Sequence, residues 1–480
     1  MLVARSWVLI LALLAGAGSG CSRSAAPSPP SPPEPPGVIT GLIAMDEPPE
    51  SKRLDLGRAA APAATPAPGA HGRVLRVGPS RELRSLKQVA ALVEPGDLVL
   101  VDGAATYEGD VVFDRPGAPA AKIVIRGVPK DGRLPKIVGI EVGVELRGDH
   151  YVLEGFDISG ASRRCVFHHA HDITLRDSVV HHCRTHGILG ADDDSGSLTL
   201  EGVEVFACGG GDRHHCIYMA TDESAHPGAV FRMQQSFVHD TLGGNAVKSR
   251  AERNEIYYNW IEGALYHELE LIGPDGQDPG LAREDSDVVG NVFVKRNPFY
   301  VVRIGGDGTG QTDGRYRFVN NTFVVRPGGS SVFRLFHGLQ SVEMHNNAFI
   351  MLGDGAVNVL REQQTRWSEG RRIIAGSANW VSAGAVNVPE EWQETRYGPE
   401  PGVRDLNAFD LRPRPGSPLA GAASAQTLAL GAYAIPRPLL LPERQPPRPN
   451  GSRFERSTPR PRRGKLAIGA FELDRHPTRQ

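Results

Sequence analysis

The 480-residue sequence lacks several features that would point to a function directly. It has no excess of either charge sign, with 53 Lys and Arg against 55 Asp and Glu, so nothing in its charge indicates nucleic-acid binding. It has only five cysteines and no C-x-x-C pair, which argues against a structural zinc site. Its N-terminal apolar run, residues 7–17, is too short to span a bilayer. What is present is a globular composition rich in turn-forming residues, with 40% hydrophobic residues, 56 Gly and 38 Pro.

The N-terminal residues have the features of an export signal. Arg5 precedes the apolar run, and small residues follow it up to Cys21, which predicts a signal peptide over residues 1–20. The end of this segment resembles a bacterial lipoprotein signal, although Gly18 stands where such signals usually have leucine. The resemblance implies lipidation of Cys21 and a periplasmic or outer-membrane lipoprotein of the bacterial cell envelope. The alternative is a plain signal peptide followed by a chance cysteine.

Residues 21–70 are predicted to be a disordered Pro/Ala-rich tether. Seven prolines fall within residues 27–36, and such a segment cannot pack into a core and is extended and stiff. Directly behind a lipidated cysteine, the tether would hold a folded domain away from a membrane.

From about residue 150, a polar or small residue followed by a short apolar strand recurs along the chain. We take as anchors Gly155, Asp177, Gly202, Ser236, Asn259, Asn291, Asn321 and Asn347, which are 22 to 34 residues apart. Repeats of this length built from short strands predict a solenoid. The late anchors are all Asn, which tolerates left-handed backbone and can hydrogen-bond to the Asn of the next coil, so we expect an Asn ladder. A sandwich of short strands is the alternative, but it would not favour the same N-x-F phrase three times.

Several stretches resemble right-handed parallel β-helix proteins of the pectate-lyase-like superfamily. They are the opening "VGP…GDLVLVDGAATYEG…KIVIRG", the N-x-F rungs and the closing "RPGSPLAG" and "LAIGAFE". More narrowly, "VKSRAERNEIYYNWIEG" followed by "HELELIGPDG" resembles a largely uncharacterised family of exported bacterial β-helix repeat proteins, in which a V-K-S-R-A motif precedes an acidic strand. The resemblance implies an all-β fold, a right-handed parallel β-helix with an N-terminal cap. We expect the cap and first coils in residues 71–130, the β-helix in 131–425, and C-terminal strands with a mobile Pro/Arg-rich loop in 426–480.

Strand alternation predicts which residues of one β-helix face point inward and which point outward. The inward residues should be Val166, Ile188, Ile217, Val247, Leu269, Leu271, Val302, Ile304, Phe333 and Leu335. The outward residues should be Phe167, Leu189, Tyr218, Lys248, Arg250, Glu268, Glu270, Arg303 and Arg334. Because successive coils stack about 4.8 Å apart, Lys248 and Arg250 should have two carboxylates one rung away and Arg303 one rung further. The strip is either functional or a cross-strand ion ladder, in which each pair contributes about 0.2–1 kcal/mol.

A strip with both charge signs fits eliminative cleavage of a uronate-containing polysaccharide. In that reaction the carboxylate is neutralised to stabilise an enolate, a base removes the C5 proton, and an acid or water protonates the leaving oxygen. We expect Lys248 to be the base, with a pKa that the neighbouring Arg250 lowers. Arg250 and Arg303 should bind carboxylates or assist proton transfer. Glu268 and Glu270 should hold a cation, with Ca²⁺ as the candidate cofactor, or orient Lys248.

The K-S pair adds a local resemblance to one alginate and chondroitin lyase family, whose "ISVKS"-type motifs place the base lysine where Lys248 stands. That family has an arginine in the next coil, in "LTLRHG", where this chain has "LELIGP". Arg303 or Tyr218 would therefore have to supply the proton. Tyr218, Glu268, Glu270, Arg334 and His239 are the candidate substrate-binding residues.

The expected function is thus that of an exported, monomeric, polysaccharide-active protein, a lyase with an acidic polysaccharide as its partner. A non-catalytic surface glycan-binding protein and a structural envelope lipoprotein are the alternatives. A glycoside hydrolase of this fold would need two or three Asp on adjacent strands, whereas Asp192 to Asp194 fall in a Ser/Gly-rich turn.

Histidine and cysteine are the remaining unusual features. Eleven of the sixteen histidines fall between residues 168 and 267, and they either bind a transition metal or form stacked polar rungs. Cys183 and Cys208 both lie six residues past their anchors and should stack. We expect them to form a disulfide, which an exported chain permits, or to pair as buried thiols.

Overall fold

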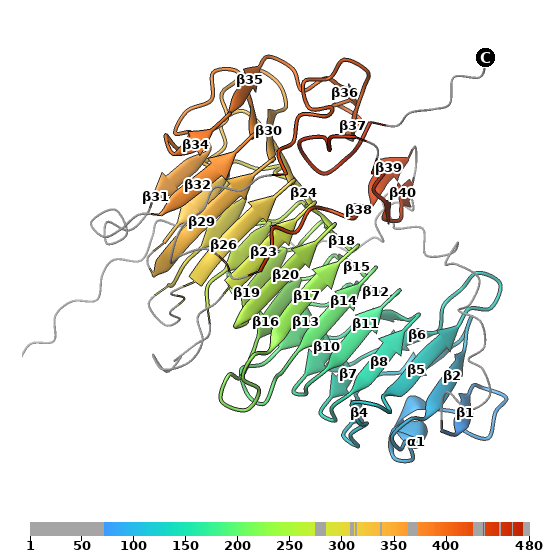
Figure 1. Cartoon of the computed structure of the whole chain (residues 1–480). Coiled ribbons are helices and arrows are strands. Elements are labelled where there is room, and N and C mark those ends of the chain that lie inside the picture. The colour runs from blue at the N-terminus through green and yellow to red at the C-terminus, as the bar shows by residue number, and fades with distance from the viewer. Residues whose placement is uncertain are drawn as a thin grey trace, which may run out of the picture. The chain divides into compact units, whose positions relative to one another are not determined.

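The chain winds repeatedly through three parallel β-sheets, and each complete coil contributes one strand to each sheet (Figure 1). The computed structural model describes residues 72–273, 285–307, 312, 314–336, 338–362, 373–425, 435, 437–450, 453–462 and 464–473. All of them belong to one compact unit, Glu47–Gln480. The predicted signal peptide, the tether and Cys21 lie outside the described residues. No helix in these ranges is long and apolar enough to cross a membrane.

Sheet 1 is formed first in each coil, and within the described residues it has 13 strands. They are β1 (Val74–Val77), β2 (Leu98–Asp102), β5 (Ile123–Val128), β8 (Tyr151–Glu154), β11 (Ile173–Arg176), β14 (Leu198–Glu201), β17 (Val230–Gln234), β20 (Arg253–Tyr257), β23 (Asp285–Val289), β26 (Gly314–Val319), β29 (Leu339–His345), β32 (Ile374–Ser377) and β34 (Trp392–Gln393). The helix α1 (Leu86–Ala90) lies between β1 and β2. A capping box between Ser85 and Gln88 starts this short helix.

Sheet 2 follows, with 12 strands in the described part of the chain. They are β3 (Thr106–Glu108), β6 (Lys136–Val138), β9 (Asp157–Ser159), β12 (Val179–His181), β15 (Glu204–Phe206), β18 (Phe237–His239), β21 (Trp260–Glu262), β24 (Val292–Val294), β27 (Thr322–Val325), β30 (Ala348–Met351), β33 (Trp380–Ser382) and β35 (Arg396–Gly398).

Sheet 3 closes each coil and has ten strands among the described residues. They are β4 (Val111–Phe113), β7 (Val142–Leu146), β10 (Arg164–His168), β13 (His186–Gly190), β16 (Ile217–Ala220), β19 (Val247–Arg250), β22 (Leu269–Leu271), β25 (Val302–Ile304), β28 (Phe333–Leu335) and β31 (Leu360–Glu362). The predicted all-β solenoid is therefore confirmed as a parallel β-helix.

Stacked apolar side chains fill the interior of the β-helix. Phe293, Phe323 and Phe349 of the three N-x-F phrases stack on one another with ring centroids 5.1 Å apart. The inward residues predicted for sheet 3 are all buried, from Val166 to Leu335. This continuous apolar column supplies the burial that one short coil could not provide alone.

The expected Asn ladder runs along the corner between sheets 1 and 2. Asn259 Nδ2 donates to Asn291 Oδ1 at 3.0 Å, and the same bond joins Asn291 to Asn321, Asn321 to Asn347, and Asn347 to Asn379. Every one of these residues is fully buried. The ladder thus satisfies polar groups that burial would otherwise leave without hydrogen bonds.

The backbone reason given for these Asn residues is wrong. The left-handed residue is the one before each ladder position, as in Tyr258, Gly290, Asn320 and Asn346. Among the early anchors, Gly155, Asp177 and Gly202 are themselves left-handed. Up to Gly202, the anchors chosen from the sequence are the left-handed turn residues. From Ser236 on, they are the residues one position later, because both positions are commonly small or polar.

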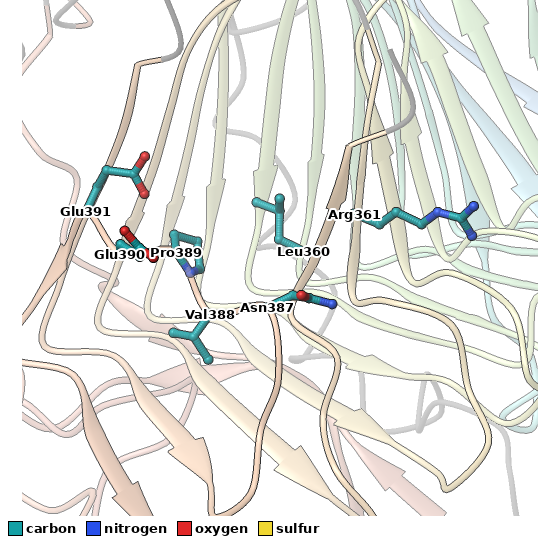
Figure 2. A pocket seen from close by; sticks show the side chains of 7 residues that line it. All are labelled: Leu360, Arg361, Asn387, Val388, Pro389, Glu390 and Glu391. Carbon is teal, nitrogen blue, oxygen red and sulfur yellow. The ribbon is translucent and has the colours of Figure 1, made fainter. Parts of the chain in front are cut away.

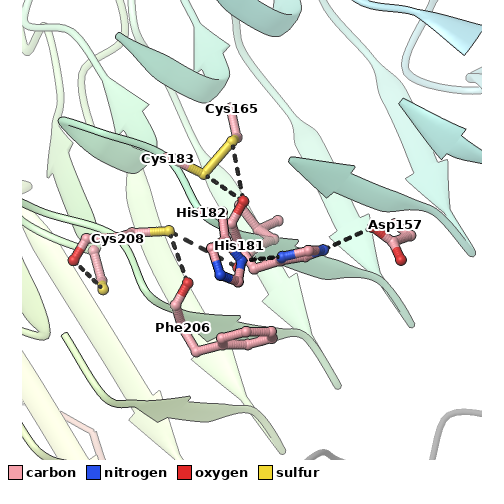
Figure 3. Close-up of a disulfide and its surroundings, with 9 residues drawn as sticks. Asp157, Cys165, His181, His182, Cys183, Phe206 and Cys208 are labelled. Atoms are coloured by element: carbon pink, nitrogen blue, oxygen red, sulfur yellow. Dashed lines mark hydrogen bonds and ion pairs between the residues drawn. A yellow bond between two sulfur atoms is a disulfide. The ribbon is translucent and has the colours of Figure 1, made fainter. Parts of the chain in front are cut away.

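The cysteines pair differently from the expectation. Cys165 and Cys183 form a disulfide (Figure 3). Cys208 and Cys216 are buried free thiols. The sulfur of Cys208 lies 3.1 Å from the carbonyl oxygen of Phe206. Cys183 thus pairs with the cysteine of the preceding sheet 3 strand instead of with Cys208.

The C-terminal residues form small antiparallel pairs against the β-helix. These pairs are β36 (Val403–Asp405) with β37 (Asp410–Pro413), β38 (Arg444–Gln445) with β41 (Thr458–Pro459), and β39 (Arg448–Asn450) with β40 (Arg453–Glu455). The ring of Phe454 stacks on Phe237 at 3.9 Å, outside sheet 2. Leu439, Leu440 and Leu441 pack outside sheet 1.

The described part of the Pro/Arg-rich loop packs against sheets 1 and 2. Its mobility stays a prediction. The closing "LAIGAFE" forms no strand, and Arg460 holds it by hydrogen bonds to Glu472 and to the carbonyls of Ala467 and Gly469.

Candidate functional site

The outer side of sheet 3 carries a row of side chains in register from coil to coil. Consecutive rungs hold Phe167, Leu189, Tyr218, Lys248, Glu270, Arg303, Arg334 and Arg361. We call these eight residues the outer row. The predicted stacking of Lys248, Glu270, Arg303 and Arg334 is confirmed. Arg361 was missed, although it alternates with buried Leu360 in the same way and could have been found by extending the pattern by one coil.

Lys248 is a partly buried amine in the middle of the outer row. Its side chain is 16% exposed, and its Nζ lies 4.8 Å from the centroid of the Tyr218 ring and 4.0 Å from Glu270 Oε2. Burial is the largest influence on its pKa and lowers it, and Arg250 and Arg303 lower it further. Glu270 acts in the opposite direction, but the 4.0 Å contact is too long to outweigh burial. The net effect is a pKa below the usual range of lysine.

Glu270 is the centre of a buried polar cluster. Its Oε1 accepts from Arg303 Nη1 at 3.0 Å, and its Oε2 accepts from Asn245 Nδ2 at 2.5 Å. Burial raises the pKa of Glu270, but Arg303, His267 and Lys248 outweigh burial and bring the pKa down to about 2. Glu270 is therefore ionised at neutral pH, and Arg303 is its main partner.

The later rungs combine arginines with aromatic rings. The guanidinium of Arg303 lies 4.0 Å from the ring centroid of Phe336, and that of Arg334 lies 4.6 Å from the centroid of Tyr300. Arg361 is exposed, and its Nη1 donates to the Tyr300 hydroxyl at 2.6 Å. Guanidinium groups beside aromatic faces suit ligands that carry both carboxylates and apolar sugar faces.

Arg250 lies on the outer side as predicted but is only 4% exposed. Its Nη2 contacts Asp307 Oδ2 at 2.5 Å, and its Nη1 donates to the Gly273 carbonyl at 3.3 Å. Arg250 therefore influences Lys248 through its charge, while its own hydrogen bonds hold the chain around Gly273 and Asp307.

The structure contradicts the placement of Glu268 on the outer side. Glu268 precedes β22, one position before the inward Leu269, and shares a buried corner row with Ala246 and Val301. Its Oε2 lies 3.1 Å from Lys295 Nζ, and burial raises its pKa to about 7 despite this lysine. The alternation failed here because Glu268 stands in the turn before the strand, where the period of two does not apply.

The structure also separates His239 from the candidate site. His239 lies on sheet 2, fully buried, with Nε2 3.1 Å from Glu204 and Nδ1 3.0 Å from Asp240. Burial lowers its pKa, but the bonds to Asp240 and Glu204 outweigh burial and raise it. His239 is a structural ion-pair partner and has no place among the substrate-binding residues.

A second polar row, which sequence reasoning missed, lies beside Lys248. The backbone N–H of His215 donates to His186 Nδ1 at 3.1 Å, that of Asn245 to His215 Nδ1 at 3.0 Å, and that of His267 to Asn245 Oδ1 at 2.9 Å. The Nδ1 of His186 also lies 3.3 Å from the carbonyl oxygen of His215. An Nδ1 that accepts a hydrogen bond carries no proton, so His215 has its proton on Nε2. Burial lowers the pKa of His186 to about 4 and that of His215 to about 3.

These bonds agree with stacked polar rungs, one of the two readings of the histidine-rich segment. No group of three or more His, Cys, Asp or Glu side chains among the described residues could hold a metal ion. The two carboxylates predicted to bind Ca²⁺ have separate cationic partners, Lys295 for Glu268 and Arg303 for Glu270.

The triple Asp sequence lies in a turn, as expected, and offers no paired catalytic carboxylates on strands. Residues 191–196 lie between β13 and β14. The Asp194 backbone N–H donates to Asp222 Oδ2 at 3.1 Å, and Asp194 Oδ1 lies 3.2 Å from His226 Nε2. These contacts join the turn to the corresponding turn of the next coil.

A hollow of about 600 Å³ lies next to the last strand of sheet 3 (Figure 2). It is lined by Leu360, Arg361, Asn387, Val388, Pro389, Glu390 and Glu391. Figure 2 shows the guanidinium of Arg361 pointing away from the carboxylates of Glu390 and Glu391. The hollow therefore adjoins the end of the outer row, with Arg361 lining both.

Comparison with known proteins gives distant structural likenesses. No protein-family model and no curated protein matches the chain. Pectate lyase Pel9A is 12% identical, with a TM-score of 0.43 over 84% of this chain and 97% of that chain. An alginate lyase from Paenibacillus sp. str. FPU-7 is 13% identical, with a TM-score of 0.36 over 68% and 99%. A GH136 lacto-N-biosidase from Eubacterium ramulus is 12% identical, with a TM-score of 0.40 over 68% of each chain. Likenesses at this level carry no argument about activity.

Proposed function

We propose that the protein binds an acidic polysaccharide along the outer row and cleaves it by β-elimination, with Lys248 as the base. The observation that carries the proposal is the environment of Lys248, a partly buried amine with a lowered pKa beside Tyr218. A base must be neutral to accept a proton, and a lowered pKa increases the neutral fraction at a given pH. Export and the lipid anchor on Cys21 remain predictions from the sequence.

The proposed chemistry needs one proton acceptor and one proton donor. Lys248 Nζ takes the proton from C5, the electron pair forms the C4–C5 double bond, and the bond from C4 to the leaving oxygen breaks. The leaving oxygen takes a proton from the Tyr218 hydroxyl or from water. Arg303 is less suited to this role than expected, because it is 5% exposed and bonded to Glu270.

The carboxylate of the sugar must be neutralised for the C5 proton to become acidic. Cationic side chains of the outer row can supply positive charge, and Arg250 adds to it from the next position on β19. Ca²⁺ stays a candidate cofactor whose requirement is decided by assay, and no step above depends on it.

The test is a lyase assay on the full chain, with and without Ca²⁺, against alginate, pectate, chondroitin and related uronates. We expect ultraviolet absorbance from the new double bond, and we expect Lys248→Ala to reduce kcat/KM by about 10²–10⁴-fold, as for loss of a general base. Lys136→Ala, an exposed lysine on sheet 2, is the matched control and should keep full activity. Undiminished turnover in Lys248→Ala would remove this lysine from the mechanism.

Non-catalytic glycan binding is the second candidate function. The observation that favours it is the pairing of Arg334 and Arg361 with Tyr300, which can bind sugars without any base. Binding of a uronate without turnover across the whole panel would establish this function in place of the lyase.

A further inference from the structure

The outer row differs in character on the two sides of Lys248. Toward the N-terminus, the next two rungs hold Tyr218 and Leu189, which are uncharged and partly exposed. Toward the C-terminus, the rungs hold Glu270 with its partner Arg303, followed by Arg334 and Arg361. The positive charge of the row is therefore concentrated on one side.

The first charged side chains on the N-terminal side of the row lie three and more rungs from Lys248, where two arginines share one glutamate. The guanidinium of Arg164 covers the ring of Phe167 at 3.8 Å. Glu145 is the neighbour of Phe167 in the register and attracts Arg164. Glu145 also accepts from Arg147 at 2.7 Å. Glu145 thus offsets part of the charge of these two arginines, and the two rungs between them and Lys248 hold the uncharged side chains of Tyr218 and Leu189.

The two arginines on the C-terminal side are oriented by a shared tyrosine. Arg334 lies over the ring of Tyr300, and Arg361 donates to its hydroxyl. With coils spaced by about 4.8 Å, Arg334 and Arg361 lie roughly 14 and 19 Å along the row from Lys248. A linear glycan laid along the row would bring acid groups over these arginines several sugars away from the reacting position.

We propose that the outer row recognises acid groups at Arg334 and Arg361, and that Tyr218 and Leu189 contact uncharged sugar faces on the other side of Lys248. The ligand class is an acidic glycan with at least two acid groups on the Arg361 side, whether or not the sugars on the other side are charged. The inference rests on the proposed function, because it takes Lys248 as the reacting position.

The test measures binding instead of turnover, using the full chain with Lys248→Ala so that no product forms. The probes are uronate oligosaccharides of defined length and their carboxyl-reduced, neutral forms. We expect Arg334→Gln and Arg361→Gln each to weaken binding of the acidic form by about tenfold, as for loss of a hydrogen bond to a charged group. Arg361→Lys, which keeps the charge, should restore most of the affinity. Arg326→Gln, an exposed arginine after β27, is the matched control.

The N-terminal side of the outer row is tested by placing a negative and a positive charge in turn at position 189. Because no acid group should lie over Leu189, Leu189→Glu and Leu189→Lys should bind the acidic oligosaccharide with affinities within about twofold of each other. A much weaker Leu189→Glu, together with unchanged Arg334→Gln and Arg361→Gln, would overturn the inference while leaving the proposed function intact. If the protein with Lys248 unchanged neither binds nor cleaves any uronate, the proposed function itself fails.

Discussion

The outer sides of sheets 1 and 3 are built by the same strand alternation but arrange their charges differently. On sheet 1, successive rungs hold Arg232, Glu255, Asp287, Arg317 and Glu343, with cations and carboxylates in near balance. On sheet 3, successive rungs hold Lys248, Glu270, Arg303, Arg334 and Arg361, with one carboxylate among four cations. The comparison shows that one fold can carry two different orders of charge along its rungs.

The two faces also differ in what covers them. Asp287 accepts from Arg253 Nη2 at 2.5 Å and from Arg317 Nε at 2.7 Å, and all three are buried. Arg317 also donates to the carbonyls of Arg437 and Pro438, which belong to the C-terminal segment that packs outside sheet 1. On sheet 3, Arg334 is half-buried and Arg361 is exposed. Sheet 1 therefore carries the ion ladder that was the structural alternative for the strip around Lys248.

The largest effect should come from breaking the ladder on sheet 1. Asp287→Asn leaves the guanidinium groups of Arg253 and Arg317 buried without their shared carboxylate. Removal of one partner from such a buried pair costs about 3–5 kcal/mol of unfolding free energy. We expect this loss in urea unfolding, with unchanged affinity for uronate oligosaccharides. A loss below about 1 kcal/mol would mean that the sheet 1 ladder is as tolerant as an exposed ion pair.

A smaller effect on stability, but a clear one on pH dependence, is expected from Glu270→Gln. Because Arg303 keeps its contacts with Gly306 and Phe336, the substitution should lower the unfolding free energy by about 1–3 kcal/mol. Glu270 raises the pKa of Lys248, and its removal lowers that pKa further. If neutral Lys248 is the base, activity rises with pH through its pKa, so the rising limb of kcat/KM should move to lower pH. If the rising limb of kcat/KM does not move, it does not reflect the titration of Lys248.

A still smaller effect is expected from salt, which should weaken ligand binding at sheet 3 more than it weakens the ion pairs of sheet 1. The Debye length falls from about 10 Å at 0.1 M to about 3 Å at 1 M, and exposed charges are screened much more than buried ones. We expect affinity for an acidic oligosaccharide to fall several-fold over this range, measured by titration calorimetry. The difference in unfolding free energy between the unmodified protein and Asp287→Asn should change little. An affinity that does not respond to salt would argue that Arg334 and Arg361 are not the anion-binding groups.

The sequence predicted the parts of the molecule that follow a strict period. The buried column of sheet 3 and the stacking of Lys248 on Glu270 and Arg303 follow from the period of two within strands and the coil repeat. Glu268 departed from the prediction because it stands in a turn, where no period applies. His239 was assigned by residue type alone, and nothing in its own strand indicated that sheet 2 would carry it.

The alternation pattern within one strand could not predict contacts between segments that are far apart in the sequence. The neutral histidine row depends on side-chain bonds from one coil to the backbone of the next, such as His186 to His215. The covering of sheet 1 by Leu439 to Leu441 depends on residues far along the chain. Burial, and therefore the lowered pKa of Lys248, depends on such contacts as well as on the charge of Arg250.

The smallest effect is expected from Tyr300→Phe, which sharpens the description of the arginine side of sheet 3. The change keeps the ring beneath Arg334 and removes only the hydroxyl that accepts from Arg361 Nη1. Loss of this hydrogen bond should weaken binding of an acidic oligosaccharide by roughly fivefold, or about 1 kcal/mol, because the guanidinium of Arg361 loses its orientation. Tyr257→Phe on sheet 1 is the control and should leave affinity unchanged.

A double-mutant cycle decides whether the Tyr300 hydroxyl acts through Arg361. If it does, Tyr300→Phe should have almost no further effect in the Arg361→Gln background, and the coupling free energy should equal the whole effect of the single change. Independent effects that simply add would show that the hydroxyl contacts the glycan directly. Full coupling would assign the hydrogen bond from Arg361 to Tyr300 a role in binding, whereas additivity would assign that role to the hydroxyl itself.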